Sequence, residues 1–396
     1  MNTKKLMTWF TLIDILFLTY LPFIALSASV IIIIPWFLLN VQIIRRDKES
    51  TTWFLFFILA VISIGIGCFL YPENIYNYVK SGFIFLSSTI YYFYFKENLF
   101  YLEKEKVLKM LYMFVVFGTI LAILYLVQPQ AFSLIKRIVN PYDGVTNSFL
   151  NGDILDQIRY NFLWTDANNV AYMFSAITLF LLATNIYSFS KSCFLILCNV
   201  IILVATMSTG GSGSFVIGLL LLILFHLRNF RYVKKSDFLC FIIVVLFIVI
   251  LGNTVLTKVI NNNILIDSSL DRVSTNSLDS RISRWEYILN NKNIMLYFLF
   301  GNGPSIVVNN TIKAPHSGVL YLIYGYGGIA FLAFIKMFFS KTSNVKIKDY
   351  IFIVPIIIGF MINTLITNPK IMAIISLLVV MARYYHNSES VVDEDV

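Results

Sequence analysis

The residues best suited to chemistry begin with Arg159, which stands a few positions before Asp166 and Asn168. A guanidinium group presents its donors in a planar fork and keeps its charge, so it matches phosphate oxygens in pairs. Asp166 and Asn168 directly precede an apolar run, where such residues commonly cap a helix, and Trp164 is typical of an interface anchor. This cluster therefore has two interpretations, anion binding by the arginine and helix capping by its neighbours.

A second cluster contains Arg281, Arg284 and Trp285. On a helix, Ile282, Trp285 and Leu289 would share one stripe, and the two arginines, three positions apart, would lie on a neighbouring face. This pattern predicts a helix lying flat on a membrane with its arginines at phosphate height. The arginines would then either meet lipid headgroups or clamp a bound anion.

A turn containing Gly301 and Gly303, followed by His316, completes the candidates. His316 stands at the start of an apolar run, where a neutral imidazole can accept a proton, although a lone histidine there is also a common structural residue. The other histidines, His226 and His386, stand at inner helix ends. The polar loops contain no Asp-x-Asp pattern, so we expect neither a metal ion nor a cofactor.

The elements that must position these residues are membrane-spanning helices. Hydrophobic residues make up 58% of the 396 positions and charged residues 13%, whereas an average soluble domain has about 25% charged residues. A bilayer can cover that much apolar surface, but the core of one soluble domain cannot. The net charge of +9 is spread over short loops, which argues against a nucleic-acid binder.

Apolar runs of about 20 residues predict an all-α chain with twelve spans. They lie near 8–24, 27–44, 51–70, 75–95, 107–127, 169–187, 191–208, 212–227, 237–256, 317–338, 350–367 and 371–386. Lysine and arginine gather in alternate connections, which places both termini in the cytoplasm. We expect a single polytopic domain over 1–396, with long outer loops at 128–168 and 257–316 that carry the clusters above.

Three features inside the spans have two interpretations each. Asp14 and Lys80 would each cost about 2.5–3.5 kcal/mol at mid-bilayer, so they should pair or line a cavity. Lys80 is close enough to a helix end to extend its ammonium group to the surface instead. The small residues of 209–214 favour close helix packing, with a backbone anion nest as the alternative.

The order of these motifs resembles the O-antigen ligase/polymerase family, that is, Wzy-type polysaccharide polymerases and their ligase relatives. The resemblance covers about 159–334. It rests on Arg159 with Asp166-Ala-Asn168, Arg281-x-x-x-Trp285, Gly301-x-Gly303, and His316 before a glycine-rich apolar helix. The chain departs from the family pattern at Ser208-Thr209-Gly210, where Ser-Arg-Gly is frequent, and at Ser317, where Asn is frequent.

The resemblance implies a bundle of the GT-C type in the bacterial cytoplasmic membrane. It implies a metal-independent, inverting glycosyltransferase that polymerises undecaprenyl-pyrophosphate-linked oligosaccharide repeat units at the outer face, alongside a flippase and a chain-length regulator. Arg159 and Arg281 would bind the donor pyrophosphate, Arg284 would support them, and His316 would be the general base. The remaining substrate contacts would be Trp285, Asp166, Asn168, Gly301 and Gly303.

Two rival functions remain. A flippase or other transporter would have a similar number of spans, but it would be expected to show related halves, and the polar residues here gather on one side of the membrane. A ligase that moves finished glycan to a final acceptor belongs to the same family. The chain has no large extra soluble domain, which favours the polymerase.

Overall fold

The computed structural model describes residues 3–139 (apart from 19, 21–25 and 46–47), 159–228 (apart from 165), 285–339 (apart from 287, 289, 291–293, 304–305, 309–310 and 314–316) and 347–385. The predicted ninth span and Arg281, Arg284 and His316 lie outside these residues. Contacts divide the chain into two compact units. The first comprises Met1–Lys104, Arg281–Val345 and Ile357–Val396, and the second comprises Glu105–Ser280 and Lys346–Ile356.

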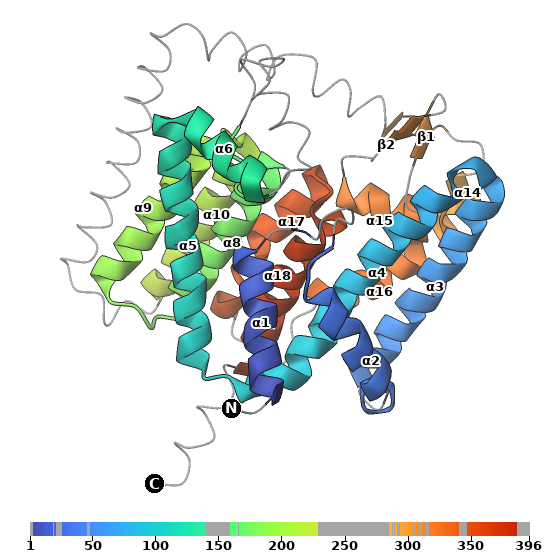
Figure 1. Ribbon diagram of the computed structural model, residues 1–396, viewed down its shortest axis with the longest axis horizontal. Helices are drawn as coiled ribbons and strands as arrows, with labels where there is room; N and C mark the ends of the chain where they lie inside the picture. The colour runs from blue at the N-terminus through green and yellow to red at the C-terminus, as the bar shows by residue number, and fades with distance from the viewer. Residues whose placement is uncertain are drawn as a thin grey trace, which may run out of the picture. The chain divides into compact units, whose positions relative to one another are not determined.

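The first unit is built around α4 (Ile75–Asn98), whose second half is a run of buried aromatic side chains from Tyr91 to Phe95. Helix α18 packs against α4, and α16 packs against α3 (Figure 1). The other elements are α1 (Thr3–Phe17), α2 (Val30–Arg45), α3 (Lys48–Leu70), α14 (Ile294–Phe300), α15 (Gly318–Tyr326), α16 (Gly328–Phe339) and α18 (Pro369–Val380). Helix α17 (Ile353–Ile362) straddles the division between the units.

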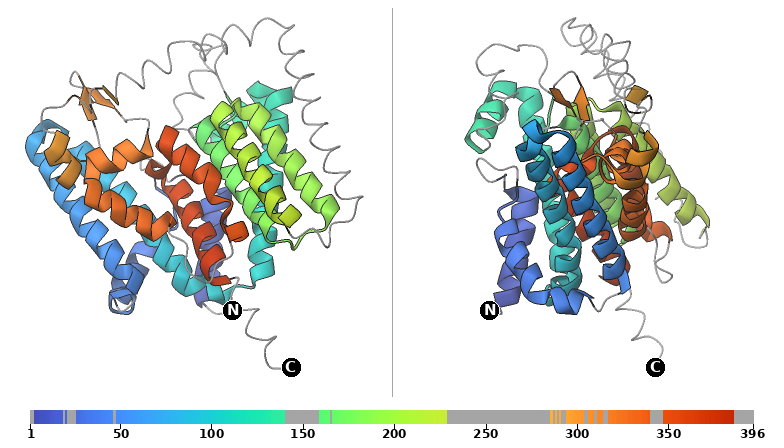
Figure 2. Two further views of the ribbon diagram at one scale, coloured as in Figure 1. Left: turned by 180° about the vertical axis from the view of Figure 1, so that it is seen from behind. Right: turned by 90° about the vertical axis from the view of Figure 1, so that its right-hand side faces the viewer.

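The second unit is built around α8 (Ala167–Ala183), which is buried along almost its whole length. Helices α9 (Phe189–Thr206) and α10 (Thr209–Arg228) pack against α8. Helix α5 (Lys104–Val127) is followed after a single residue by α6 (Pro129–Val139), which runs across the end of α5 rather than continuing it (Figure 1, Figure 2). Helix α6 therefore occupies the first part of the predicted 128–168 loop.

The described residues are mostly helical and apolar, as expected of an α-helical membrane protein. Within them, three helical segments are both long and apolar enough to cross a membrane: Ser50–Leu70, Lys104–Val127 and Phe189–Thr206. Shorter apolar helical segments cover Val30–Gln42, Ala167–Ala183, Thr209–Phe225 and Gly328–Phe339. The count of twelve spans remains a prediction. One short antiparallel hairpin, β1 (Ile306–Val308) with β2 (Thr311–Lys313), lies in the predicted second outer loop.

The predicted span at 317–338 differs from a continuous helix. It divides into α15 and α16 at Gly327, whose φ of 92° belongs to the left-handed region that glycine adopts without a steric penalty. The backbone of α14 approaches Gly327 so closely that a Cβ atom there would overlap the Leu299 carbonyl. Packing of α14 against this corner explains why the apolar run does not form one helix.

Candidate functional site

Arg159 joins the ends of two helices in the second unit. Its Nε donates to the carbonyl of Thr206, the last residue of α9, at 2.7 Å. Its Nη2 donates to Oδ1 of Asn168, in the first turn of α8, at 3.0 Å. Two hydrogen bonds from different nitrogens fix the plane of the guanidinium group, so its positive charge has a defined position.

Asn168 is oriented by the same cluster. Its Oδ1 accepts from Ser208 Oγ at 3.0 Å as well as from Arg159. Ser208 Oγ accepts in turn from the backbone N–H of Gly211 at 3.2 Å, as the side chain of an N-cap does. Because both bonds are made to Oδ1, the Nδ2 group of Asn168 points away from Arg159 and Ser208 as a donor. Asn168 therefore takes part in the arginine cluster and does not cap the helix.

Asp166 does cap the helix, as one of the two interpretations predicted. Its Oδ1 accepts from the backbone N–H groups of Asn168 at 2.7 Å and Asn169 at 3.3 Å. The N-termini of α8 and α10 thus meet beside Arg159, and both carry partial positive charge. A fixed guanidinium beside two helix N-termini is an arrangement that attracts oxyanions such as phosphate, with the Asp166 carboxylate and the C-terminal carbonyl of α9 as the local counter-charges.

The loop that carries Arg159 is held by buried aromatic residues. Tyr160 donates its hydroxyl to the Gly118 carbonyl at 2.7 Å, and burial raises the pKa of this phenol well above 10. Trp164 is 1% exposed and lies against Phe114 and Phe162, so its predicted role as an interface anchor is wrong. Phe162 has a φ of 51°, which turns the loop back so that these rings face the protein.

The small residues of 209–214 pack helices together, as the favoured interpretation predicted. A Cβ atom at Gly210 would overlap the Tyr172 hydroxyl, and one at Gly211 would overlap the Cβ of Ala171. Because Gly210 and Gly211 have no Cβ atom, α10 can approach α8 closely, which brings Ser208 within hydrogen-bond distance of Asn168.

The predicted glycine turn lies in the first unit. Asn302 N–H donates to the Tyr324 carbonyl at 2.8 Å, and Gly303 N–H donates to the Gly325 carbonyl at 2.9 Å. Gly301 and Gly303 have φ values of 77° and 89°. The Asn302 side chain donates to Tyr324 Oη at 2.9 Å, and its Oδ1 is buried without a hydrogen-bond partner among the described residues. The two glycines thus hold a tight turn against the C-terminal end of α15.

This turn should tolerate no side chain at its first glycine. We expect Gly301→Ala to destabilise the protein by about 1–3 kcal/mol, since a non-glycine residue would be held at positive φ and its Cβ would crowd the backbone of α15. Thermal unfolding in detergent measures the effect. Gly65→Ala is the matched control in the same unit, because a Cβ at Gly65 meets nothing within 4 Å. Equal melting temperatures for both variants would contradict this account.

One open, mostly apolar hollow of about 230 Å³ lies in the first unit. A residue from each of two predicted motifs lines it. Trp285, the last residue of the arginine motif, lines it together with Ser317, which follows His316 in the sequence. Ser317 caps α15 by accepting from the Leu320 N–H at 3.4 Å. The remaining lining residues are Val319, Leu320 and Met361.

No protein-family model, curated protein or solved structure matches this chain. Among the described residues, no group of three His, Cys, Asp or Glu side chains is placed to hold a metal ion.

Two residues complete the arginine cluster: Thr206, which sequence reasoning missed, and Ser208, which it named only within a departure from the family pattern. Their positions depend on the sharp corner between α9 and α10, where Met207 adopts a φ of 50°. Ser208 could have been found as an N-cap, because a serine directly before a helical run is a usual start signal. Nothing in the sequence marks the Thr206 carbonyl as a partner of Arg159.

Proposed function

We propose that this protein is a glycosyltransferase that polymerises undecaprenyl-pyrophosphate-linked oligosaccharide repeat units into surface polysaccharide at the outer face of a bacterial cytoplasmic membrane. The observation that supports this best is the Arg159 cluster, a fixed cation where the N-termini of α8 and α10 meet. The apolar helices support residence in a membrane. The motif resemblance supports the choice of substrate.

The proposed reaction moves the growing glycan from its lipid pyrophosphate onto a hydroxyl of the next lipid-linked unit. The acceptor oxygen attacks the anomeric carbon while the bond from that carbon to the pyrophosphate oxygen breaks, which inverts the centre. His316 takes the hydroxyl proton. Pyrophosphate is already a good leaving group, so the main task is to stabilise its departing charge, which Arg159 and Arg281 would do with Arg284 in support.

The substrate contacts follow from the same proposal. Asn168 would donate through Nδ2 to a phosphate or sugar oxygen, because its Oδ1 is engaged by Arg159 and Ser208. Trp285 and Ser317 line the hollow in the first unit, where an apolar part of the substrate would lie. Asp166 shapes the backbone beside Arg159 in the second unit, and Gly301 and Gly303 shape a turn in the first unit.

A deletion strain tests the function as a whole. We expect single repeat units to accumulate on the lipid carrier and long-chain polysaccharide to disappear, because initiation and export of each unit would continue without polymerisation. The measurement is the size distribution of surface polysaccharide and lipid-linked intermediates, with the complemented strain as the control. Long lipid-linked chains that never reach a final acceptor would instead indicate a ligase, and units retained on the cytoplasmic leaflet would indicate a flippase.

Complementation with point variants tests the assigned chemistry. Arg281→Ala and His316→Ala should each abolish long-chain product while the protein stays in the membrane at normal abundance, since one removes charge stabilisation and the other the proton acceptor. His226→Ala is a matched control, because His226 stands at the opposite end of α10 from Ser208. Near-normal chain lengths in Arg281→Ala or His316→Ala would refute that residue's role.

A further inference from the structure

Helix α6 presents three different faces. Phe132, Ser133 and Lys136 are buried against the rest of the second unit. A second face is apolar and exposed, with exposed fractions of 53% for Leu134, 39% for Ile135 and 82% for Ile138. The third face is exposed and polar, formed by Gln130 and Arg137. A helix lying in a bilayer surface has such a division, with one side toward acyl chains and one toward headgroups.

The helix before α6 places it at the height of a membrane surface. Helix α5 has 24 residues, and at about 1.5 Å per residue it is long enough to cross the hydrocarbon core. Its exposed side is apolar up to its last residues, with Leu126 46% exposed and Val127 71% exposed. Since only Gln128 separates the two helices, α6 begins where α5 leaves the hydrocarbon.

The buried face of α6 is attached to the loop that carries Arg159. Lys136 is 1% exposed and donates to Asn161 Oδ1 at 2.5 Å. The ring of Phe132 lies 5.4 Å, centroid to centroid, from that of Tyr160. Asn161 and Tyr160 are the two residues that follow Arg159, so the depth of α6 in the bilayer determines the depth of the arginine.

We propose that α6 is an interfacial membrane anchor, whose Leu134, Ile135 and Ile138 face enters the outer leaflet and which thereby holds the Arg159 loop at the level of lipid phosphates. The partner is a lipid surface, recognised by an apolar stripe flanked by the exposed cation of Arg137. The membrane contact does not depend on the proposed glycosyl transfer. Only the benefit to Arg159, alignment with a lipid-linked pyrophosphate, depends on it.

Nitroxide labels report this depth directly. Single cysteines at 135, 138 and 130, in full-length protein whose four native cysteines are replaced, are labelled and reconstituted into nanodiscs of phosphatidylethanolamine and phosphatidylglycerol. Collision with oxygen, which concentrates in hydrocarbon, is compared with collision with water-soluble nickel chelate. We expect a severalfold higher oxygen-to-nickel ratio at 135 and 138 than at 130, because Gln130 lies on the polar face. A label at Ile120, an exposed residue within α5, is the deep reference.

The result also separates this inference from the proposed function. Equal, water-like ratios at 130, 135 and 138 would overturn the anchor, whatever the activity of the protein. Ratios at 135 and 138 equal to that at Ile120 would also overturn it, since they would place α6 inside the hydrocarbon core. An interfacial profile in a protein that transfers no sugar would uphold the anchor and refute only the enzymatic proposal.

Discussion

Replacing Lys370 with methionine is expected to lower the free energy of unfolding by about 3–5 kcal/mol, because the Asp14 carboxylate would be left buried without its cation. The side chains of Asp14 and Lys370 are both fully buried, and Lys370 Nζ lies 3.4 Å from Asp14 Oδ1. Removal of one partner from such a pair is among the most destabilising single changes in a protein.

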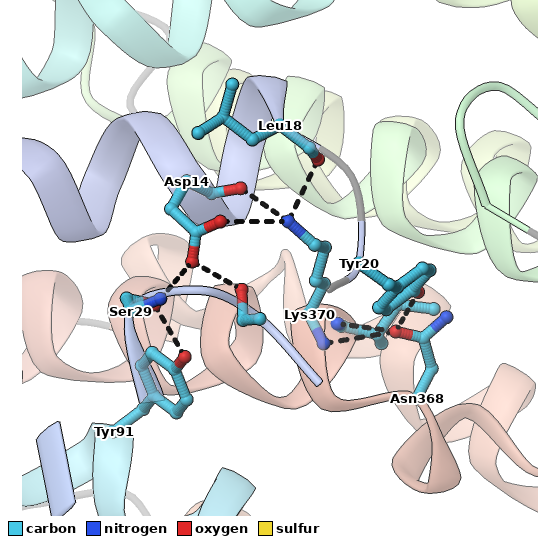
Figure 3. A network of polar contacts seen from close by, with 9 residues as sticks. Asp14, Leu18, Tyr20, Ser29, Tyr91, Asn368 and Lys370 are labelled. Carbon is cyan, nitrogen blue, oxygen red and sulfur yellow. Dashed lines mark hydrogen bonds and ion pairs between the residues drawn. The ribbon is translucent and has the colours of Figure 1, made fainter. Parts of the chain in front are cut away.

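Lys370 also closes the end of α1. Its Nζ donates to the backbone carbonyls of Asp14 at 2.5 Å and Leu18 at 2.9 Å, near the end of that helix (Figure 3). Carbonyls in the last turn of a helix have no partner within the helix, and a lysine is a favourable donor to them. Methionine would leave these carbonyls unbonded as well, which adds to the loss from Asp14.

The carboxylate of Asp14 connects α1 to the start of α2. Its Oδ2 accepts from Ser27 Oγ at 2.6 Å and from the Ser29 N–H at 2.7 Å, directly before α2 begins at Val30. Ser29 Oγ lies 2.7 Å from the Tyr91 hydroxyl of α4, which extends the network (Figure 3). One buried pair therefore connects α1, α2 and α18, and the network reaches α4.

Thermal unfolding of purified protein in detergent measures the loss, with a double-mutant cycle to isolate the pair. Asp14→Asn and Lys370→Met should each lower the melting temperature strongly, and the double variant should lose less than the two losses combined. Lys80→Met is the matched control, because Lys80 lies in the same unit but is partly exposed, with its ammonium 5.6 Å from the ring centroid of the exposed Tyr76. If Lys370→Met melted no lower than Lys80→Met, the buried pair would not stabilise the fold.

Part of the network around Asp14 could be predicted from the sequence, but its geometry could not. A carboxylate within an apolar run indicated that Asp14 would pair or line a cavity, and the pairing is confirmed. Its partner could not be predicted, because Lys370 is 356 residues away and was expected in the short connection between the last two predicted spans, whereas the structure places it in α18. Lys80 stands in the second turn of α4, near a helix end as predicted, and its ammonium lies over the ring of Tyr76.

The apolar runs predicted helices well where a run is long and uniform, as in α5 and α9. The apolar runs did not predict where a helix ends when tertiary contacts determine the end. At Gly327, for example, the backbone of α14 interrupts the run. Helix α6 was missed because its apolar side is narrow and its buried side includes Lys136. An apolar spacing of three and four residues through Leu134, Ile135 and Ile138 was the available signal.

On the proposed function, replacing Arg159 with alanine is expected to reduce the rate of glycan polymerisation by about 100- to 1000-fold, the usual effect of removing a single charge-stabilising donor. Arg159→Lys should recover little of this rate. A lysine keeps the charge, but its single nitrogen cannot donate to Thr206 and Asn168 in one fixed plane as Nε and Nη2 do. The measurement is the rate of chain extension from purified lipid-linked repeat units by protein in nanodiscs.

Two further variants distinguish catalysis from loss of structure. Ser208→Ala removes one of the two bonds to Asn168 Oδ1 and leaves Arg159 charged, so its effect should be clearly smaller than that of Arg159→Ala. Lys191→Ala removes an exposed cation from α9 in the same unit and should leave the rate unchanged. A folded Arg159→Ala protein with a rate within about two-fold of the wild type would show that the guanidinium only joins α8 to α9. The oxyanion site would then have to be sought around Arg281 and Arg284, because the paired helix N-termini without their arginine carry only partial charges.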